Sequence, residues 1–467
     1  MLPLMGGMAC FLFPTISKFL GLISALAIFA AVGGLGWQMI EEGAQRYAIG
    51  GWGASLGIDL YADGLSLLML VMAALVGLGV SVYSSAYFSR EKTNHFWPLW
   101  LFLWGALNAL FLSADIFNLY VTLELLGLSA VSLVALAGGA DALNSAMRYL
   151  FVSLLGSLFY LLGVALLYHS FGSLDIATLA QRIEPTPAVW SAVGLMSAGL
   201  LLKTALFPMH FWLPAAHASA PAPVSALLSA LVVKASFYIL LRLWLDIFPL
   251  TDNSLGQLLG LLGATAVLWG SIQALRQTRL KLLIAYSTVA QLGYLFLAFP
   301  LGTSIAWKGA LYMLLSHAMA KAAMFLAAGN ILCFGGHDRI ADLDRVAQRL
   351  PVTLIAFAVA GVSIMGLPPS GGFIAKWLLL EASMGSGQWW WVIVLILGGL
   401  LAAAYVFRVI GHAFTQAELA HEAAAVPARM EWTALMLAFA AIILGLISPA
   451  VFELMGIGNP FGGGRAG

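Results

Sequence analysis

Residues Leu200–Trp244 read LLLKTALFPMHFWLPAAHASAPAPVSALLSALVVKASFYILLRLW, and they place two lysines, Lys203 and Lys234, inside sequence apolar enough to span a bilayer. An ammonium group at the centre of a membrane helix costs about 2.5–3.5 kcal/mol on insertion scales. A chain that keeps two of them must give each a partner, a water-filled cavity or a function. The rest of the chain is therefore interpreted around these two residues.

Prolines interrupt this stretch between the two lysines, and two histidines accompany them: Pro208, His210, Pro214, His217, Pro221 and Pro223. Proline removes an amide donor and breaks the hydrogen-bond ladder of a helix. Irregular backbone at membrane depth is tolerated only where it faces protein or a wet cavity. We therefore expect two interrupted helices that line a hydrated path.

The composition excludes an ordinary soluble protein. Of 467 residues, 62% are hydrophobic and 9% charged, whereas soluble domains carry about 25% charged residues. The net charge of +1 gives no indication of nucleic acid or an anionic partner. Cys10 and Cys333 are too few and too far apart for a Cys-rich metal site, so we expect no cofactor and no metal. The fold class predicted is an all-α polytopic membrane protein.

A run of about 20 apolar residues spans the hydrocarbon, and on that rule the chain offers about fourteen candidate helices. They lie near 2–14, 19–38, 64–86, 95–112, 114–137, 146–168, 190–213, 222–247, 255–275, 281–300, 306–334, 351–382, 389–411 and 431–455. The segment 351–382 contains GLPPSGG and is expected to be a second broken helix. Residues 46–59 give a hairpin signal, and 174–186 and 337–350 are expected to be loops.

Two blocks of five helices carry matching features, which predicts an internal repeat. In each block the fourth helix is broken by proline and carries a lysine, Lys203 in one and Lys376 in the other. Because five is odd, the blocks run with opposite topology, as in secondary transporters built from inverted repeats. We expect N-terminal helices and a periplasmic hairpin in 1–94, the first repeat in 95–247, the inverted repeat in 255–411, and a C-terminal helix and tail in 412–467.

Lysine and arginine are distributed unequally between alternate loops. Loops after odd-numbered helices hold twelve of these residues and the other side holds five. The positive-inside rule then predicts a multi-pass protein of the cell inner (plasma) membrane with both termini outward. The basic residues left over are all lysines: Lys203, Lys234, Lys321 and Lys376. A desolvated lysine can release its proton near neutral pH, whereas arginine effectively cannot.

Glu124 is the one acid predicted near the middle of a span, so it must be paired or protonated there. Lys203 is its natural partner, because an opposite charge within hydrogen-bond reach favours the ionised form of both. A purely structural ion pair is the alternative to a proton relay. Lys234 has no acid within reach in the sequence, which indicates that it exchanges its proton.

The remaining candidates lie in the second half and at the broken helix. His317 and Lys321 are one helical turn apart and share a face, a spacing that suits a relay from Lys234 to Lys376. Lys376 could instead extend toward the membrane surface. His210 and His217 are weaker candidates, since they could simply cap backbone groups at the helix ends. Ser287 and Gln291 could supply polar groups, but packing between helices is the commoner explanation.

These residues resemble a family. The motif K-x-A-x-F-P-x-H-x-W-L-P-x-A-H-x-x-A-P-x-P-V-S-A from Lys203 to Ala226, with Glu124, Lys234, the His317–Lys321 helix and GLPPSGGF before Lys376, is similar to the antiporter-like subunits of respiratory complex I and the multisubunit (Mrp-type) Na⁺/H⁺ antiporters. The resemblance covers roughly residues 60–430 and implies a fourteen-helix fold with inverted repeats and obligatory partner subunits. It also implies Glu124, Lys203, Lys234 and Lys376 as functional charges.

Among the family members, the short N-terminal region, the GGW hairpin and lysine at position 376 are most similar to the D-type subunits of Mrp antiporters. We therefore expect a non-enzymatic proton-translocating subunit of a monovalent cation (Na⁺)/proton antiporter, with other antiporter subunits, protons, Na⁺ and lipid as partners. One alternative is a non-redox pump subunit of a complex I-like NADH–quinone oxidoreductase or a membrane-bound hydrogenase. Another is the membrane partner of an inorganic-carbon uptake complex.

Overall fold

The computed structural model describes residues 1–51, 58–248, 253–343, 346–416 and 424–461. The first half contains α1 (Leu2–Leu12), α2 (Ser17–Glu42), β1 (Gln45–Ala48), β2 (Asp59–Ala62), α3 (Gly64–Tyr87), α4 (Arg90–Leu112), α5 (Ile116–Ala135), α6 (Gly139–Phe171), α7 (Ile176–Arg182), α8 (Pro187–Thr204), α9 (Leu213–Ser219), α10 (Ala222–Leu227) and α11 (Val233–Arg242). The second half contains α12 (Ser254–Arg276), α13 (Leu280–Phe296), α14 (Ala298–Leu301), α15 (Ser304–Gly335), α16 (Val346–Arg349), α17 (Pro351–Met365), α18 (Gly371–Gly385), α19 (Trp390–His412), α20 (Ala428–Leu446) and α21 (Ser448–Met455).

The predicted all-α membrane fold is confirmed. In the part of the chain that the structure describes, eleven helices are long and apolar enough to cross a membrane. Residues Ala222–Ile247 count as one of them, because π-helical turns at Leu228–Val232 and Leu243–Ile247 continue α10 and α11. The first expected span is shorter than predicted, since α1 has 11 residues and reaches only about 16 Å.

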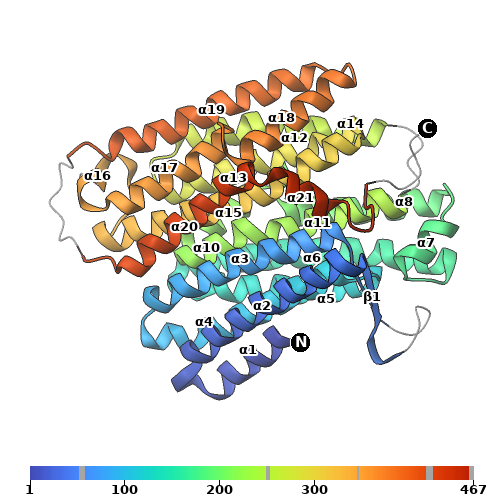
Figure 1. The fold of residues 1–467 in the computed structure, drawn as a ribbon, viewed down its shortest axis with the longest axis horizontal. Helices are drawn as coiled ribbons and strands as arrows, with labels where there is room; N and C mark the ends of the chain where they lie inside the picture. Colours follow the sequence, from blue (N-terminus) through green and yellow to red (C-terminus); the bar gives the residue numbers. More distant parts are fainter. Residues whose placement is uncertain (52–57, 249–252, 344–345, 417–423, 462–467) are drawn as a thin grey trace.

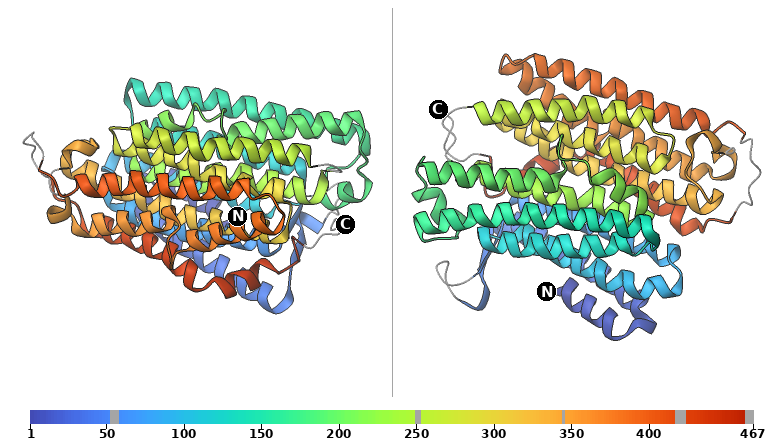
Figure 2. Two further views of the ribbon diagram at one scale, coloured as in Figure 1. Left: turned by 90° about the horizontal axis from the view of Figure 1, so that it is seen from above. Right: turned by 180° about the vertical axis from the view of Figure 1, so that it is seen from behind.

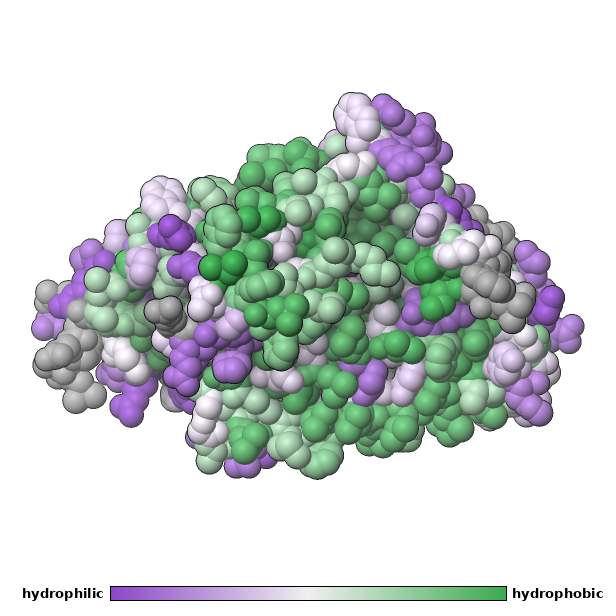
Figure 3. Space-filling view, turned by 90° about the horizontal axis from the view of Figure 1, so that it is seen from below, coloured by the Kyte–Doolittle hydropathy of each residue, from purple (hydrophilic) through white to green (hydrophobic). Residues whose placement is uncertain are grey.

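The long helices run roughly parallel to one axis, so the molecule has two distinct ends (Figure 1). One end, called here the hairpin end, carries β1, β2 and α7, and the opposite end carries α16 (Figure 1). Figure 3 shows a broad hydrophobic face over the body of the bundle, with hydrophilic side chains gathered mainly toward the two ends. This distribution is the one expected for helices that cross the hydrocarbon and expose polar residues at both surfaces.

The predicted connections are partly confirmed and partly corrected. The hairpin exists as the antiparallel pair β1–β2, which aligns Gln45 with Ala62; part of the segment that predicted it, residues 52–57, lies outside the described residues. The expected loop at 174–186 contains the short helix α7, because the Asp175 carboxylate caps it by accepting a hydrogen bond from the Thr178 amide at 2.8 Å. The expected loop at 337–350 likewise contains α16.

Both predicted helix breaks are present, and each leaves backbone carbonyls that side chains satisfy. After α8 the chain turns through Ala205, whose φ of 58° is left-handed, and the indole of Trp212 donates to the carbonyl of Leu202 at 3.0 Å. After α17 the chain turns at Gly366, whose φ of 83° suits glycine. Lys376 then donates to the freed carbonyl of Met365 at 2.9 Å. The broken helices therefore place backbone carbonyls inside the bundle that accept hydrogen bonds from side chains.

The two five-helix blocks lie side by side in both views of Figure 2. In each block a long third helix packs on the broken fourth helix: α6 packs on α8, and α15 packs on α17 and α18. The domain boundaries predicted from the sequence stay a prediction. The α6–α8 crossing is close because glycines meet there, and a side chain at Gly199 would overlap the carbonyl oxygen of Gly156.

This crossing gives a stability prediction. Gly199→Val should separate α6 from α8 and lower the free energy of unfolding by about 1–3 kcal/mol, the usual cost of overpacking. Gly194→Val on the same helix is the matched control, because a Cβ there meets nothing within 4 Å. Thermal unfolding of the two variants in detergent checks this, and equal melting temperatures would contradict the close crossing.

Candidate functional site

Glu124 and Lys203 are each bonded to a serine of α6. The carboxylate of Glu124, on α5, accepts a hydrogen bond from the hydroxyl of Ser157. The Nζ atom of Lys203, at the end of α8, donates to Oγ of Ser153 at 2.9 Å. Because Ser153 and Ser157 are four residues apart, they lie on the same face of α6. The acid and the amine are therefore held on adjacent turns of one helix.

The direct pair expected between Glu124 and Lys203 is not formed. Among the described residues, the ion pairs closer than 4.0 Å do not include these two. Lys203 is buried, whereas Glu124 is only half-buried at the outer side of α5. The charge of Glu124 nevertheless acts on Lys203. The geometry is that of an indirect pair with two hydroxyl groups between the charges.

Lys234 is fully buried, and its amine is bonded to a distorted turn of its own helix. The π-helical turn Leu228–Val232 precedes it, and its Nζ donates to the carbonyl oxygen of Ser229 at 2.8 Å. The hydroxyl of Ser229 lies 2.9 Å from that of Thr288 on α13. π-Helical turns of this kind occur frequently at functional sites. Lys234 is thus connected to α13 through Ser229.

Lys321, on α15, reaches the same turn of α13. Its Nζ donates to the hydroxyl of Ser287 and, at 3.2 Å, to the carbonyl oxygen of Ile284. The hydroxyl of Thr288 donates to that same oxygen at 3.0 Å. Lys321 is therefore bonded to α13 directly, whereas Lys234 reaches the neighbouring residue Thr288 only through Ser229. The charge of Lys321 also acts on Lys234.

Lys376, on α18, is bonded near the next turn of α13. Its Nζ donates to the carbonyl oxygens of Ile364 at 3.1 Å and Met365 at 2.9 Å, at the end of α17. The amide of Gln291, one turn after Ser287, donates to the Ile364 oxygen at 3.4 Å. Lys376 is buried and does not extend to the surface. α13 thus contacts Lys321 directly, and its residues Thr288 and Gln291 bond the same residues that hold Lys234 and Lys376.

The three candidate histidines have different positions. His317 is buried within range of the charges of Lys234 and Lys321, and its Nε2 atom has no protein partner among the described residues. His217 is buried and stacks on Phe325, with ring centroids 4.8 Å apart. His210 is only half-buried and stacks on Phe207 at 5.5 Å. The structure thus brings His317 to the lysines, places His217 nearby and leaves His210 at the edge.

Lys203 lies near this series across a narrow gap. A small cavity of about 10 Å³ lies beside Lys203 and is bounded by Val232 and Ser236, the residues two before and two after Lys234. That volume suits a single water molecule. Lys203 is therefore close to the helix of Lys234 but is not bonded to it.

Two basic residues assigned to loops by the sequence count lie inside the protein instead. Arg242 is buried and paired with Asp63 at 2.5 Å. Lys281 is buried at the start of α13, where its Nζ donates to the carbonyl oxygens of Ala218 and Ala220. The expectation that every arginine lies outside the membrane helices is therefore wrong. The sequence did carry a signal for the burial of Arg242, because this residue lies inside an apolar run that continues to Trp244.

Comparisons with known proteins agree with this architecture. Residues 113–402 match the family described as "NADH:quinone oxidoreductase/Mrp antiporter, TM", and residues 50–97 match "NADH-Ubiquinone oxidoreductase (complex I), chain 5 N-terminus". NADH-quinone oxidoreductase subunit N of Desulforudis audaxviator is 37% identical over 404 residues, which cover 84% of this chain and 80% of that protein. The D-type subunit of the Na⁺/H⁺ antiporter of Bacillus subtilis is 29% identical over 400 residues, with the same coverages of 84% and 80%.

Solved structures show the same fold. A chain of the membrane-bound sulfane sulfur reductase, an archaeal respiratory complex, superposes with a TM-score of 0.90 at 27% identity and covers 97% of this chain and 94% of that one. A chain of the Mrp complex from Dietzia sp. DQ12-45-1b superposes with a TM-score of 0.89 at 23% identity, covering 98% and 96%. The specific likeness to the D-type Mrp subunits is not favoured, because subunit N of the oxidoreductase is the more identical relative. The chain belongs to the family of antiporter-like membrane subunits shared by NADH:quinone oxidoreductases and Mrp antiporters.

Proposed function

We propose that this chain is a proton-translocating membrane subunit of a quinone-linked oxidoreductase. Its relative in Desulforudis audaxviator is named NADH-quinone oxidoreductase subunit N. The observation that carries the proposal is the series of buried polar groups along α13, which contacts Lys234 through Ser229, and Lys321 directly, and leads to Lys376. The proposed relay consists of Lys203, Lys234, His317, Lys321 and Lys376. Glu124 regulates it through its effect on Lys203.

The bonding partners of the lysines support proton exchange. Lys234 and Lys376 donate to carbonyl oxygens, and Lys321 donates to a carbonyl and a hydroxyl. No carboxylate among the described residues forms an ion pair with any of the three. A neighbouring carboxylate would favour the charged form, so its absence leaves both protonation states accessible. The charge of Lys321 acts on Lys234, which couples the two amines.

Glu124 is placed to respond to a partner subunit. It lies on α5 beside Val121, Leu125 and Leu128, whose side chains are exposed. An exposed apolar face of this kind marks a surface for lipid or protein. We propose that a neighbouring subunit covers it, and that the state of that subunit alters how strongly Glu124 holds the proton of Lys203 through Ser157 and Ser153.

Cation/proton antiport, the function first expected from the sequence, stays a second candidate because the Bacillus subtilis antiporter subunit is 29% identical over 400 residues. The two functions differ in what drives proton movement across the membrane. In an oxidoreductase, electron transfer to quinone drives it, whereas in an antiporter it exchanges with a cation.

The first prediction tests the function in inverted membrane vesicles that contain the whole complex. NADH oxidation with added quinone should acidify the vesicle interior, measured by quenching of a pH dye. Lys234→Arg should lower the rate of proton uptake roughly 100-fold, since a proton-transfer group contributes at least that much and arginine stays protonated. Lys308→Arg, in a lysine outside the buried series, is the control.

Three other outcomes would be decisive. Quenching of the pH dye that requires an imposed Na⁺ gradient, and does not follow NADH oxidation, would favour the antiporter. Full proton uptake in Lys234→Arg would contradict the relay role of this residue, and equal loss in Lys308→Arg would show that the effect is not specific to Lys234.

The second prediction concerns the indirect pair. Glu124→Gln and Ser157→Ala should each reduce proton uptake strongly, because both remove the same hydrogen bond. The double variant should lose little more than either single variant, since residues that act as a unit are not additive. Ser170→Ala, an exposed serine of α6, should behave as the unmodified protein. Losses that multiply in the double variant would show that Glu124 and Ser157 act independently.

We also propose that the hairpin end faces outward, as the distribution of basic residues predicts. In a background with Cys10 and Cys333 replaced by alanine, an impermeant thiol reagent applied to intact cells should label Glu184→Cys and spare Gln348→Cys. Both positions are exposed, near α7 and on α16 respectively. The reverse pattern would invert the proposed orientation.

A further inference from the structure

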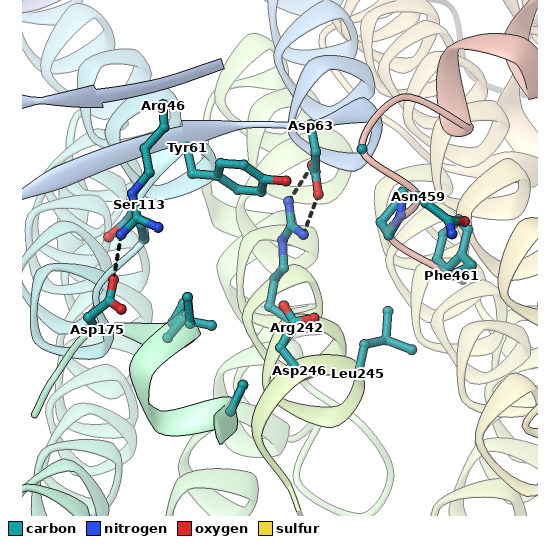
Figure 4. A pocket seen from close by; sticks show the side chains of 16 residues that line it. Arg46, Tyr61, Asp63, Ser113, Asp175, Arg242, Leu245, Asp246, Asn459 and Phe461 are labelled. Atoms are coloured by element: carbon teal, nitrogen blue, oxygen red, sulfur yellow. Dashed lines mark hydrogen bonds and ion pairs between the residues drawn. The ribbon is translucent and has the colours of Figure 1, made fainter. Parts of the chain in front are cut away.

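A cavity of about 510 Å³ opens at the hairpin end and is not part of the lysine series (Figure 4). Its walls come from the hairpin, α7, the end of the Ala222–Ile247 helix and the segment 458–461. The ionisable groups that line it are Arg46, Tyr61, Asp63, Asp175, Arg242 and Asp246. Arg46 and Asn459 are exposed at its rim, so the cavity reaches the surface.

A polar face of one helix leads from the buried lysines to this cavity. Lys234, Tyr238, Arg242 and Asp246 occur at intervals of four residues within Ala222–Ile247. Residues spaced by four lie above one another on a helix. The Nε atom of Arg242 donates to the hydroxyl of Tyr238 at 3.1 Å. The face therefore begins at the fully buried Lys234 and ends at Asp246 in the cavity wall.

Arg242 does not carry a free positive charge across this face. It donates to the two carboxylate oxygens of Asp63 at 2.6 and 2.5 Å, and to the hydroxyl of Ser66 at 2.9 Å. Burial alone would raise the pKa of Asp63, but Arg242 and the hydrogen bonds of Ser66 bring it below its ordinary value. Asp63 therefore stays ionised and neutralises the guanidinium. A proton that passes this level meets a neutral pair.

Asp246 differs from the other carboxylates of the cavity. Asp63 is paired with Arg242, and Asp175 with Arg46 at 2.7 Å. Within the described residues, no side chain forms an ion pair or hydrogen bond with Asp246, although the charges of Arg242 and Asp63 act on it. Figure 4 shows it on the helix turn below Arg242, at the cavity wall. It is the carboxylate of this wall that can take up and release a proton without breaking an ion pair.

We propose that this cavity is the mouth through which protons pass between the buried lysines and the solution at the hairpin end, and that Asp246 is the group that exchanges them with that solution. The inference rests on the proposed function. An ammonium group at Lys234 gives its proton along the polar face to the Asp246 carboxylate, which leaves a neutral amine and a neutral acid. Release of that proton from Asp246 to the solution restores the carboxylate. The Arg242–Asp63 pair holds its charges fixed during both steps.

The transport test uses the assembled complex in inverted vesicles. Asp246→Asn keeps the size of the side chain but cannot exchange a proton, so proton uptake should fall roughly 100-fold, while Asp246→Glu should retain most of it. Glu184→Gln, an exposed carboxylate of the same end outside the cavity, is the control. Each variant is compared at equal membrane abundance of the complex. Uptake by Asp246→Asn equal to that of the unmodified protein would overturn the proposal.

A labelling test reads the cavity without depending on transport. Asp246→Cys, in the background lacking Cys10 and Cys333, should react with a small charged thiol reagent from the same side of the membrane as Glu184→Cys. Resistance to the reagent from that side would overturn the assignment of the cavity as a mouth. If the unmodified complex moves no protons but Asp246→Cys is labelled, the proposed function fails while the access route stands.

Discussion

Every ammonium group buried in this bundle needs an oxygen acceptor, and the fold supplies these largely from its own backbone. In the interior of a regular helix each carbonyl already accepts a hydrogen bond from the amide four positions later. The breaks change this: the end of α17 frees two carbonyls for Lys376, and the end of α9 presents carbonyls to Lys281. The π-helical turn before Lys234 does the same for the oxygen of Ser229. The irregular segments are therefore a requirement of the buried charges.

The kind of acceptor separates two classes of buried base. Arg242 is held by a carboxylate, and the pair satisfies both charges at once. Such a pair is costly to break, because removal of one partner leaves a buried charge uncompensated. The lysines of the series are held by neutral oxygens, which solvate an ammonium and tolerate a neutral amine. Arg242 thus fixes structure at one end of the helix, while Lys234, two turns earlier, is held by a carbonyl oxygen.

Some of these features could be predicted from the sequence, and others could not. Prolines and buried lysines are local signals, so the broken helices and the burial of Lys321 and Lys376 could be found from the chain alone. The serines that separate Glu124 from Lys203 could not, because the rotation of α5, α6 and α8 about their axes decides which side chains meet. Arg242 was misassigned because its position near a helix end was taken for a loop, although it lies within the expected span 222–247; the partner that neutralises it, Asp63, is far away in the sequence. The role of α13 depends on three helices converging on it, which no spacing within α13 reveals.

The position of Glu124 affects the chain before it assembles with partner subunits. Half-buried on a helix face beside exposed apolar side chains, its carboxylate would meet hydrocarbon in a bilayer that holds this chain alone. An acid at that depth costs about 2.5–3.5 kcal/mol, a large fraction of the roughly 5–15 kcal/mol by which folded proteins are typically stable. Under the proposed function, a partner subunit that covers α5 removes this cost, so the same acid favours the assembled chain over the isolated one.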